Sequence, residues 1–436
     1  MDKIKDIYQL FIKYPVISTD SRTDLTNSIF FAIKGDNFDG NAYALKAIEK
    51  GAAYAIVDDQ NLTKHPKLIL VDNSLNCLQK LATHHRKQLN IPIIAVSGSN
   101  GKTTTKELIT LVLQKKYKVF ATPGNLNNHI GLPLSLLQIN AQHEIAILEL
   151  GANHIGENKM LIDICLPSHG IVTNIGKDHM GEFGSWEGIV EAYKEILDYF
   201  NQDESCTFFL NTDDTSLTSL VKSQNVISYS YKDQVETHIK GNLLNDELLC
   251  KVVVKSSIQN EKSVVSSKLF GSYNIYNILA AWAIGEYFQI ESKLIIQALE
   301  NYNPKNNRSQ IIKWKSNTLI FDAYNANPSS LSLALHDFGN LAVNNKSIIF
   351  GDMHELGAYS KTEHENIIKQ LSKYNFNHVM LVGKYFTDAC NNENYLCFPN
   401  VLSLQSWMKN QKFKDAYILL KGSRSEQIET AFEGIL

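Results

Sequence analysis

The sequence reads Gly98-Ser99-Asn100-Gly101-Lys102-Thr103-Thr104-Thr105 directly after an apolar run that begins at Ile91. The residues from Lys106 to Ile109 then have the pattern of the start of a helix. In a strand–turn–helix of this kind, backbone N–H groups at the helix N-terminus face a phosphate, the lysine adds a positive charge and the threonine hydroxyl reaches Mg²⁺. The stretch therefore predicts an α/β unit with a phosphate-binding loop.

The spacing of this loop differs from that of the generic phosphate loop. The generic motif would place its first glycine at position 96, which is Val96, and the nearest glycine is Gly98. The loop is therefore a variant, and the variant is more informative than the generic motif.

Length and composition indicate a multi-domain globular chain. With 436 residues, of which 44% are hydrophobic and 20% charged, the chain should form two or three domains. The formal net charge of −3 provides no basic field for nucleic acid or an anionic membrane. The charged first six residues do not suit a signal peptide, no apolar run is long enough to span a bilayer, and the six scattered cysteines favour free thiols. We therefore expect a cytoplasmic protein without nucleic-acid binding or membrane insertion.

Short apolar runs alternate with helical patterns along the chain, which favours α/β architecture with mainly parallel sheets. We expect three parts, 1–88, 89–303 and 304–436, with a loop signal at Pro304-Lys305-Asn306-Asn307. The expected helices include 43–50, one around 84–86 and 275–288, and 206–269 is richer in β pattern. The expected strands are Ser28–Ile33, Ala53–Val57, Leu68–Val71, Ile91–Val96, Glu144–Leu148, Gly170–Ile175, Thr318–Phe321, Ser347–Phe350, Val379–Val382 and Tyr417–Leu420.

Two titratable side chains follow expected strands of the central part. Glu149 comes directly after Leu148, and His179 follows the run that ends at Ile175. Because ligands bind outside the carboxyl ends of strands in open α/β sheets, Glu149 is a candidate Mg²⁺ ligand or a group that orients an attacking nucleophile. A capping or solvated carboxylate explains Glu149 equally well, and a single histidine is usually structural.

Three further polar loops lie near strand ends: Gly124-Asn125-Leu126-Asn127-Asn128-His129-Ile130-Gly131, Asp322-Ala323-Tyr324-Asn325-Ala326-Asn327-Pro328 and Lys421-Gly422-Ser423-Arg424-Ser425. The first is rich in amides, which suit recognition of amides and carboxylates, although composition alone favours an ordinary turn. Five polar loops at strand ends are hard to dismiss together. They indicate an enzyme that uses ATP or GTP with Mg²⁺ in a cleft between domains.

The residues alone do not identify the acceptor of the activated group. A phosphoryl-transfer enzyme can stop at a phosphorylated product or pass the activated group to a second nucleophile. The large third part favours the second, because closure over two substrates would exclude water from a reactive intermediate.

Taken together, these segments resemble the Mur ligase family, whose members build the peptide of bacterial cell-wall precursors. The loop spacing is the family's own, and the matching segments keep the family's order from near residue 20 to near residue 425. The amide-rich loop and 322–328 are most similar to the branch that adds D-alanyl-D-alanine, and the Asp-Asn-Pro-Arg type motif of the branch that adds the third residue is absent. The matching segments are Asp20-Ser21-Arg22, Gly98–Thr105, Gly124–Gly131, Glu149–Asn153, Asp322–Pro328, Gly351–Gly357 and Lys421–Arg424.

The resemblance implies a fold and a reaction. The implied domains are a small N-terminal α/β domain for the UDP end of a substrate, a central P-loop ATPase domain with a mainly parallel sheet, and a C-terminal Rossmann-like domain. The implied activity joins D-Ala-D-Ala to UDP-MurNAc-tripeptide through an acyl phosphate, with ATP and Mg²⁺, in peptidoglycan precursor synthesis. We expect a monomer.

The resemblance also assigns roles to residues by match to the family's motifs. The implied catalytic residues are Lys102, Glu149 and His179, and the implied metal ligands are Thr103, Glu149 and His179. The implied ATP-binding residues are Gly98, Ser99, Asn100, Gly101, Lys102, Thr103, Thr104, Asn274, Arg308 and Asp322. The implied substrate-binding residues are Ser21 and Arg22 for the UDP part, with Asn125, Asn127, Asn128, Asn325 and Asn327.

One segment departs from the family's pattern. The family has a carbamylated lysine that bridges to a second Mg²⁺ in an Ala-Lys-x-Glu pattern, whereas this chain has Ala192-Tyr193-Lys194-Glu195. One position along a helix is a rotation of about 100°. Either the helix shifts register locally and Lys194 serves, which we favour, or Tyr193 replaces the carbamate and the second metal is held differently. A smaller departure is Tyr273, where relatives often have histidine.

Two alternatives stay open on the sequence. Another Mur-type ligase would add a different amino acid or dipeptide. A non-catalytic relative would bind a nucleotide sugar or ATP as a regulator; the displaced lysine favours it, whereas the retained Lys102, Thr103, Glu149 and His179 argue against it. The sequence does not determine the third residue of the peptide substrate, diaminopimelate or lysine.

Overall fold

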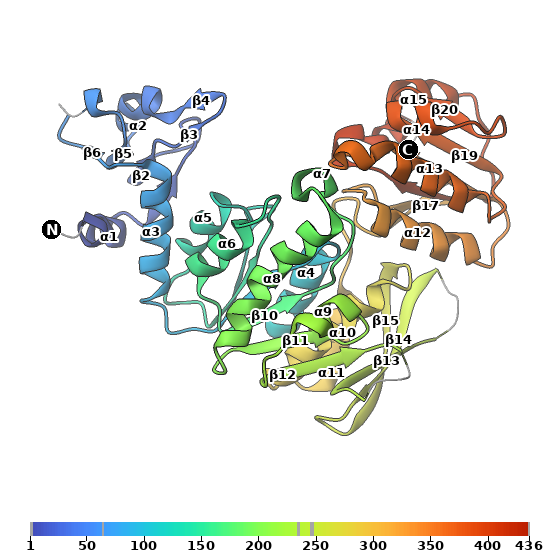
Figure 1. The fold of residues 1–436 in the computed structure, drawn as a ribbon, viewed down its shortest axis with the longest axis horizontal. Helices are drawn as coiled ribbons and strands as arrows, with labels where there is room; N and C mark the ends of the chain where they lie inside the picture. Colours follow the sequence, from blue (N-terminus) through green and yellow to red (C-terminus); the bar gives the residue numbers. More distant parts are fainter. Residues whose placement is uncertain (1–2, 63–64, 233–235, 245–247, 435–436) are drawn as a thin grey trace.

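The computed structural model describes residues 3–62, 65–232, 236–244 and 248–434, which form three α/β units in chain order. The first and last units lie at opposite ends of the molecule, with the central unit between them (Figure 1). Each unit has its own mainly parallel sheet, which confirms the predicted fold class. The boundaries after residues 88 and 303 stay predictions, and residues 1–2 and 435–436 of the outer parts lie outside the described residues.

The N-terminal unit contains a parallel sheet with the strand order β1-β2-β5-β6 and a short β3–β4 hairpin. Helix α3 leads from this sheet to the central unit, where it contacts α5 and α6. The strands are β1 (Val16–Ser18), β2 (Ser28–Phe31), β3 (Lys34–Gly35), β4 (Phe38–Asp39), β5 (Tyr54–Val57) and β6 (Leu68–Leu70), and the helices are α1 (Lys3–Lys13), α2 (Ala44–Glu49) and α3 (Ser74–Arg86).

The central unit contains a nine-stranded sheet with the order β15-β14-β13-β12-β11-β10-β7-β9-β8. The pairs from β8 to β13 are parallel, whereas β13–β14 and β14–β15 are antiparallel. The strands are β7 (Ile93–Ser97), β8 (Val119–Ala121), β9 (Ile145–Glu149), β10 (His169–Val172), β11 (Thr207–Asn211), β12 (Val226–Ser230), β13 (Ile239–Leu243), β14 (Leu249–Ser256) and β15 (Glu261–Phe270). The helices are α4 (Lys102–Leu113), α5 (Gly131–Leu136), α6 (Glu157–Cys165), α7 (Met180–Phe183), α8 (Trp186–Gln202), α9 (Thr215–Leu220), α10 (Asn274–Tyr287) and α11 (Ser292–Asn301).

Side-chain alternation along β7 divides the central core into two layers. Ile94 and Val96 face a cluster that includes α4 and the almost fully buried α10, whereas Ile93 and Ala95 face a cluster that includes α5, α6 and α8. A strand buried on both faces reads as a continuous apolar run, which explains why the sequence pattern identified it. The layers fix the carboxyl end of β7, and therefore the loop that follows it.

The C-terminal unit contains a six-stranded sheet with the order β16-β17-β21-β18-β19-β20, in which only β16–β17 is antiparallel. Helix α12 begins with the N-cap Asn327, a capping box with Ser330 and proline at its first turn. The strands are β16 (Gln310–Trp314), β17 (Asn317–Phe321), β18 (Lys346–Gly351), β19 (His378–Val382), β20 (Leu396–Phe398) and β21 (Tyr417–Lys421), and the helices are α12 (Pro328–Asn340), α13 (Ser360–Leu371), α14 (Lys384–Ala389) and α15 (Val401–Met408).

Every expected strand has a counterpart, with one informative difference in length. The expected strand to Ile175 ends at Val172. Beyond it, the hydroxyl of Thr173 donates to the Asn100 carbonyl at 2.6 Å, and the Asn174 side chain accepts from the Asn100 N–H at 3.1 Å. These residues leave the sheet because they bind the phosphate loop. Within the described residues, no helix is both long and apolar enough to cross a membrane.

Candidate functional site

A cavity of about 460 Å³ lies between the carboxyl ends of the central strands and the C-terminal unit. It collects residues from segments that are more than 200 positions apart in the chain. The sequence-predicted residues that line it are Ser99, Asn100, Gly101, Lys102, Thr103, Thr104, Asn125, Asn127, Asn128, Glu149, His179, Asn274, Arg308, Asp322, Asn325 and Asn327. Gly98 is not among the lining residues, but its carbonyl accepts from the Lys102 ammonium. Ser21 and Arg22 lie in the N-terminal unit, away from the cavity.

The phosphate loop connects β7 to the N-terminus of α4. Gly101 is the N-cap of α4 with a φ of 82°, and a Cβ there would lie 2.6 Å from the Asn277 Oδ1 atom. Both the left-handed conformation and the close approach require glycine at this position. The Lys102 ammonium donates to the carbonyl of Gly98 and, at 3.3 Å, to that of Ser99. The loop therefore places a lysine charge beside the N–H groups of a helix N-terminus, which is an anion-binding arrangement.

Glu149 is the last residue of β9 and its side chain is 3% exposed. Its Oε1 atom accepts from the Thr103 hydroxyl at 3.2 Å and from the Asn127 amide at 2.9 Å. Its Oε2 atom lies 3.1 Å from the Lys106 ammonium and has no hydrogen-bond partner. The interpretation of Glu149 as a solvated carboxylate is therefore wrong, because this carboxylate is buried beside the phosphate loop.

The donors around Glu149 fit a magnesium ion that also takes ligands from phosphate. A hydroxyl from Thr103 and the Glu149 carboxylate, whose Oε2 atom has no hydrogen-bond partner, are hard oxygen donors, and Mg²⁺ usually keeps waters and substrate phosphates as its other ligands. His179 lines the same cavity, with its Nδ1 atom 3.1 Å from the Glu355 carboxylate. In the described part of the chain, no group of three or more His, Cys, Asp or Glu side chains could hold a metal by itself.

The amide-rich loop combines a turn with a contact to the buried carboxylate. The Asn128 side chain accepts from the Gly131 N–H at 2.9 Å and from the Ile130 N–H at 3.2 Å, as in an ordinary turn before α5. Asn127 instead donates to Glu149. The turn interpretation therefore describes Asn128, and recognition of substrate by this loop stays a prediction.

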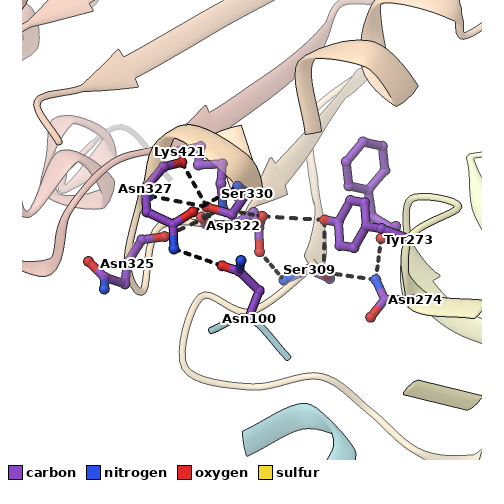
Figure 2. A network of polar contacts seen from close by, with 10 residues as sticks. Asn100, Tyr273, Asn274, Ser309, Asp322, Asn325, Asn327, Ser330 and Lys421 are labelled. Carbon is purple, nitrogen blue, oxygen red and sulfur yellow. Dashed lines mark hydrogen bonds and ion pairs between the residues drawn. The ribbon is translucent and has the colours of Figure 1, made fainter. Parts of the chain in front are cut away.

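Asp322 is the centre of a polar network at the C-terminal side of the cavity, and Figure 2 shows its partners. Its Oδ2 atom accepts from the Lys421 ammonium at 2.7 Å and from the Tyr273 hydroxyl at 3.3 Å, and its Oδ1 atom accepts from the Ser309 N–H at 3.1 Å. Burial raises the pKa of Tyr273 well above its usual value, so the phenol stays protonated and donates. The network joins the start of α10 to strands β17 and β21.

The two units also meet at the phosphate loop itself. The Asn327 side-chain amide donates to Asn100 Oδ1 at 2.9 Å, a contact between the N-cap of α12 and the loop (Figure 2). Asn325 lines the cavity and accepts from Lys421 through its carbonyl at 3.4 Å. The C-terminal unit therefore forms one wall of the phosphate-loop cavity.

Two predicted residues have partners of their own beside the cavity. The Arg308 guanidinium lies 3.4 Å from the ring centroid of Tyr324, a cation–π contact that presents the guanidinium at the cavity wall. The Asn274 side-chain amide donates to the Phe270 carbonyl at 2.7 Å, and its Oδ1 atom accepts from Asn277 at 2.8 Å. Asn274 is therefore held in a structural role as well as lining the cavity.

Ser21 and Arg22 belong to the N-terminal unit, in the loop between β1 and β2. Arg22 donates to both carboxylate oxygens of Asp20, which lowers the pKa of Asp20 to about 2. The Ser21 carbonyl accepts from the Lys50 ammonium at 2.7 Å. The structure does not bring these residues into the phosphate-loop cavity.

The favoured expectation, that the helix shifts register locally so that Lys194 serves as the carbamylated lysine, is wrong. Helix α8 is continuous from Trp186 to Gln202, so its register does not shift. Lys194 lies on the outer face, paired with Asp198 at 3.2 Å and Glu191 at 3.6 Å. Hydrogen bonding to Asp198 raises the pKa of Lys194, which favours the charged ammonium over the neutral amine that a carbamate needs.

Tyr193 takes the inner position instead. Its hydroxyl donates to Asp178 Oδ2 at 3.0 Å, and the Ser99 hydroxyl of the phosphate loop donates to Asp178 Oδ1 at 2.6 Å. Burial, with the Asp178 carboxylate, raises the pKa of Tyr193 well above its usual value. A neutral phenol therefore holds Asp178, and through it Ser99, in place.

Tyr193→Phe should lower the free energy of unfolding by about 1–3 kcal/mol, because a buried carboxylate loses a hydrogen bond. Lys194→Ala, next to it on the outer face, should leave stability unchanged because exposed ion pairs contribute little. Urea unfolding of both variants measures the difference. Equal stability of the two variants would contradict the inward position of Tyr193.

Several residues of the cavity were not predicted from the sequence. Asn277 follows Asn274 by one helical turn, so helical periodicity could have identified it. Outside the cavity, periodicity favours the alternative in which Tyr193 takes the inner position, because Tyr193 continues the buried face of Ile189 and Ala192. Other lining residues include Tyr273, Tyr324, Glu355 and Lys421, which stand at positions or in segments quoted from the sequence but were given no site role there, and Ser309, which has no local signal of this kind.

Models of three domains of one family match consecutive parts of the chain. "Mur ligase family, catalytic domain" matches residues 13–98, "Mur ligase middle domain" matches 96–285, and "Mur ligase, glutamate ligase domain" matches 307–424. Together these matches span most of the chain, including every segment that lines the cavity.

The chain is also similar to complete proteins. It is 31% identical to the UDP-N-acetylmuramoyl-tripeptide–D-alanyl-D-alanine ligase of Bacillus subtilis, over 96% of this chain and 93% of that protein. The ligase of the same name from Treponema pallidum is 30% identical, over 95% and 92%. The crystal structure of MurF from Acinetobacter baumannii superimposes with a TM-score of 0.87 at 28% identity, over 96% and 92%. The chain therefore belongs to the Mur ligase family.

Proposed function

We propose that this protein is an ATP-dependent ligase that joins D-alanyl-D-alanine to UDP-N-acetylmuramoyl-tripeptide in peptidoglycan precursor synthesis. The observation that carries the proposal is the single cavity that combines a phosphate loop, a buried Glu149 and the Asp322–Lys421 network of the C-terminal unit. The relatives that carry this activity in their names match nearly the whole chain, so all three units are accounted for.

The reaction requires activation because a carboxylate is a poor electrophile. The γ-phosphoryl group of ATP passes to the terminal carboxylate of the tripeptide, which gives ADP and an acyl phosphate. The D-Ala-D-Ala amine then attacks the carbonyl carbon, loses a proton, and the C–O bond to phosphate breaks as the amide forms. Both reacting partners are anionic, so positive groups must offset the charge at the transferring phosphoryl.

We propose roles for the cavity residues that follow from their positions. Lys102 and the N–H groups at the start of α4 bind the phosphates of ATP. Asn274, Arg308 and Asp322 hold the nucleotide between the units, and Asn125, Asn127, Asn128, Asn325 and Asn327 face the peptide substrates. Ser21 and Arg22 bind the UDP end. The C-terminal unit excludes water from the acyl phosphate by forming one wall of the cavity.

We propose that Mg²⁺ is held by Thr103 and Glu149, with His179 at its edge. When bound, Mg²⁺ supplies charge stabilisation at the transferring phosphoryl group. Tyr193 takes the place of the family's carbamylated lysine and holds Asp178 and Ser99 in position without adding a metal ligand of its own.

Three further statements belong to the proposal. The units extend over 1–88, 89–303 and 304–436, supported by the grouping of the strands into separate sheets. The protein works as a monomer, since the cavity is built from segments of one chain. The reaction takes place in the cytoplasm, where ATP and UDP-linked precursors are available.

Phosphate release from ATP with UDP-MurNAc-tripeptide and a series of acceptors tests the function. We expect turnover with D-Ala-D-Ala and only background release with D-alanine or L-alanine, because a pocket built for a dipeptide leaves polar groups unpaired when a single residue binds. Diaminopimelate and lysine forms of the tripeptide should be compared in the same assay. Equal turnover with a single amino acid would assign the protein to another ligase of the family, and binding of ATP without turnover would make it a regulator.

A further inference from the structure

The C-terminal unit contacts the loop that carries His179 at several points. The Gly181 N–H donates to the Glu355 carbonyl at 2.9 Å, and the Tyr359 hydroxyl donates to the Gly184 carbonyl at 3.1 Å. At the start of the same loop, the Lys177 ammonium pairs with Glu363 at 2.6 Å. The Lys177 N–H also donates to the Ser329 hydroxyl at 2.9 Å. Residues 177–184 of the central unit are therefore held by several contacts from the C-terminal unit, close to α7 in Figure 1.

Within this interface, the backbone of Gly181 packs directly against the backbone of Gly357. A Cβ on Gly181 would lie 2.8 Å from the Gly357 nitrogen, and a Cβ on Gly357 would lie 2.9 Å from the Gly181 Cα atom. Neither position leaves room for a side chain. The close approach brings Glu355, two residues before Gly357, into contact with His179.

His179 and Glu355 face each other across this contact, and both have unusual backbone conformations. The φ of His179 is 46° and that of Glu355 is 65°, in the left-handed region that residues other than glycine rarely adopt. The His179 Nδ1 and Glu355 Oε2 atoms lie 3.1 Å apart, without a hydrogen bond of standard geometry. Strained residues of this kind persist where the surrounding structure requires them, typically at functional sites.

We propose that Glu355 is a positioning residue that orients His179 only when the C-terminal unit is docked on the central unit. A histidine that serves a metal site usually directs one ring nitrogen to a carboxylate, which fixes the ring and leaves the other nitrogen for the metal. Here the carboxylate comes from a different unit than the histidine. This inference rests on the proposed function, because it assigns a partner to a residue of the proposed magnesium–nucleotide site.

The consequence is a reciprocal coupling between docking and magnesium binding. If docking of the C-terminal unit sets His179 in place, then binding of Mg²⁺ with the nucleotide favours the docked arrangement by the same factor. The magnesium site is then complete only when the C-terminal unit, which forms the wall that excludes water, is docked on the central unit. Phosphoryl transfer to water in an open enzyme is thereby disfavoured.

The test compares Glu355→Gln with Glu365→Gln, a change at an exposed glutamate of α13 that pairs with Lys361 at 3.9 Å. Calorimetry on the full chain first measures binding of a non-hydrolysable ATP analogue in the presence of EDTA. In separate samples without EDTA, it then measures the Mg²⁺ affinity of the complex of the protein with the analogue. Glu355→Gln should weaken Mg²⁺ affinity about 10–100-fold and leave binding of the analogue in EDTA unchanged. Glu365→Gln should match the unmodified protein in both measurements.

A second variant separates the effect of docking from the effect of the Glu355 carboxylate. Gly181→Ala keeps His179 and Glu355, and alanine suits the ordinary helical conformation of α7, but its Cβ would collide with Gly357. It should weaken Mg²⁺ affinity as Glu355→Gln does and should also give a more extended small-angle scattering profile. Circular dichroism checks that both variants fold.

Two results have different meanings. Mg²⁺ affinity within twofold of the unmodified protein in Glu355→Gln would overturn the role of Glu355 while leaving the proposed function intact. Failure of the unmodified protein to bind the analogue at all would instead overturn the proposed function. His179→Ala combined with Glu355→Gln should weaken Mg²⁺ affinity no further than His179→Ala alone, because the two residues act as one unit, and additive losses would contradict the inference.

Discussion

Lys102→Ala should lower ligation by at least about 10³-fold, because it removes the one side-chain cation of the loop that faces the transferring phosphoryl group. Binding of the UDP substrate should be unchanged, since Ser21 and Arg22 lie in a different unit from the phosphate loop. Phosphate release measures the first effect, and calorimetry with UDP-MurNAc-tripeptide measures the second.

The matched control for Lys102 is Lys115, an exposed lysine just beyond the other end of α4 whose ammonium contacts Gln297 at 3.0 Å. Lys115→Ala removes the same charge from the protein and should keep normal turnover. Near-normal turnover in Lys102→Ala would refute the assignment of the phosphate loop, and equal losses in both variants would indicate a nonspecific effect of charge.

Glu149→Gln should lower both turnover and stability. Turnover should fall about 10²–10³-fold, because the proposed magnesium site loses its only carboxylate. The free energy of unfolding should fall by about 3 kcal/mol, since the Lys106 ammonium, which is 5% exposed, is left without its counter-charge. Phosphate-release assays and urea unfolding measure the two effects.

A double variant separates the two consequences of this change. Glu149→Gln with Lys106→Met removes the uncompensated charge and should recover stability relative to Glu149→Gln, whereas turnover should stay low. Glu144→Gln, an exposed carboxylate just before β9 that accepts from the Lys118 N–H, is the control and should change neither quantity. Recovery of turnover in the double variant would show that Glu149 acts through stability alone.

Local sequence patterns were sufficient for the architecture. Strands such as β7 and β9 are buried on both faces, so their apolar runs stand out, and the loop from Gly98 to Thr105 is identified by turn and helix signals that act within a few residues. Short strands at sheet edges, such as β1 and β20, have weaker patterns and were not predicted. The family's motifs selected the residues that line the cavity, and the structure places nearly all of them there.

The pairings across the cavity could not be predicted from the sequence. Asp322 and Lys421 are separated by 99 residues, and they pair because β17 and β21 are neighbours in the C-terminal sheet. The contact between His179 and Glu355 depends on how one unit docks on another. No local pattern encodes distances of this kind, because they depend on strand order and on packing between units.

The sequence by itself determined an α/β chain with a phosphate loop and the ends of the strands where polar loops gather, because these depend on periodicity and turn chemistry within short segments. The family followed from the resemblance of those segments to the family's motifs. Only the tertiary structure decided that the side chain of Tyr193, and not that of Lys194, faces the phosphate loop. It also decided which unit supplies a partner for His179. The reason is physical: the face that a helix buries and the docking of two units are set by packing against distant residues, which act together only after the chain has folded.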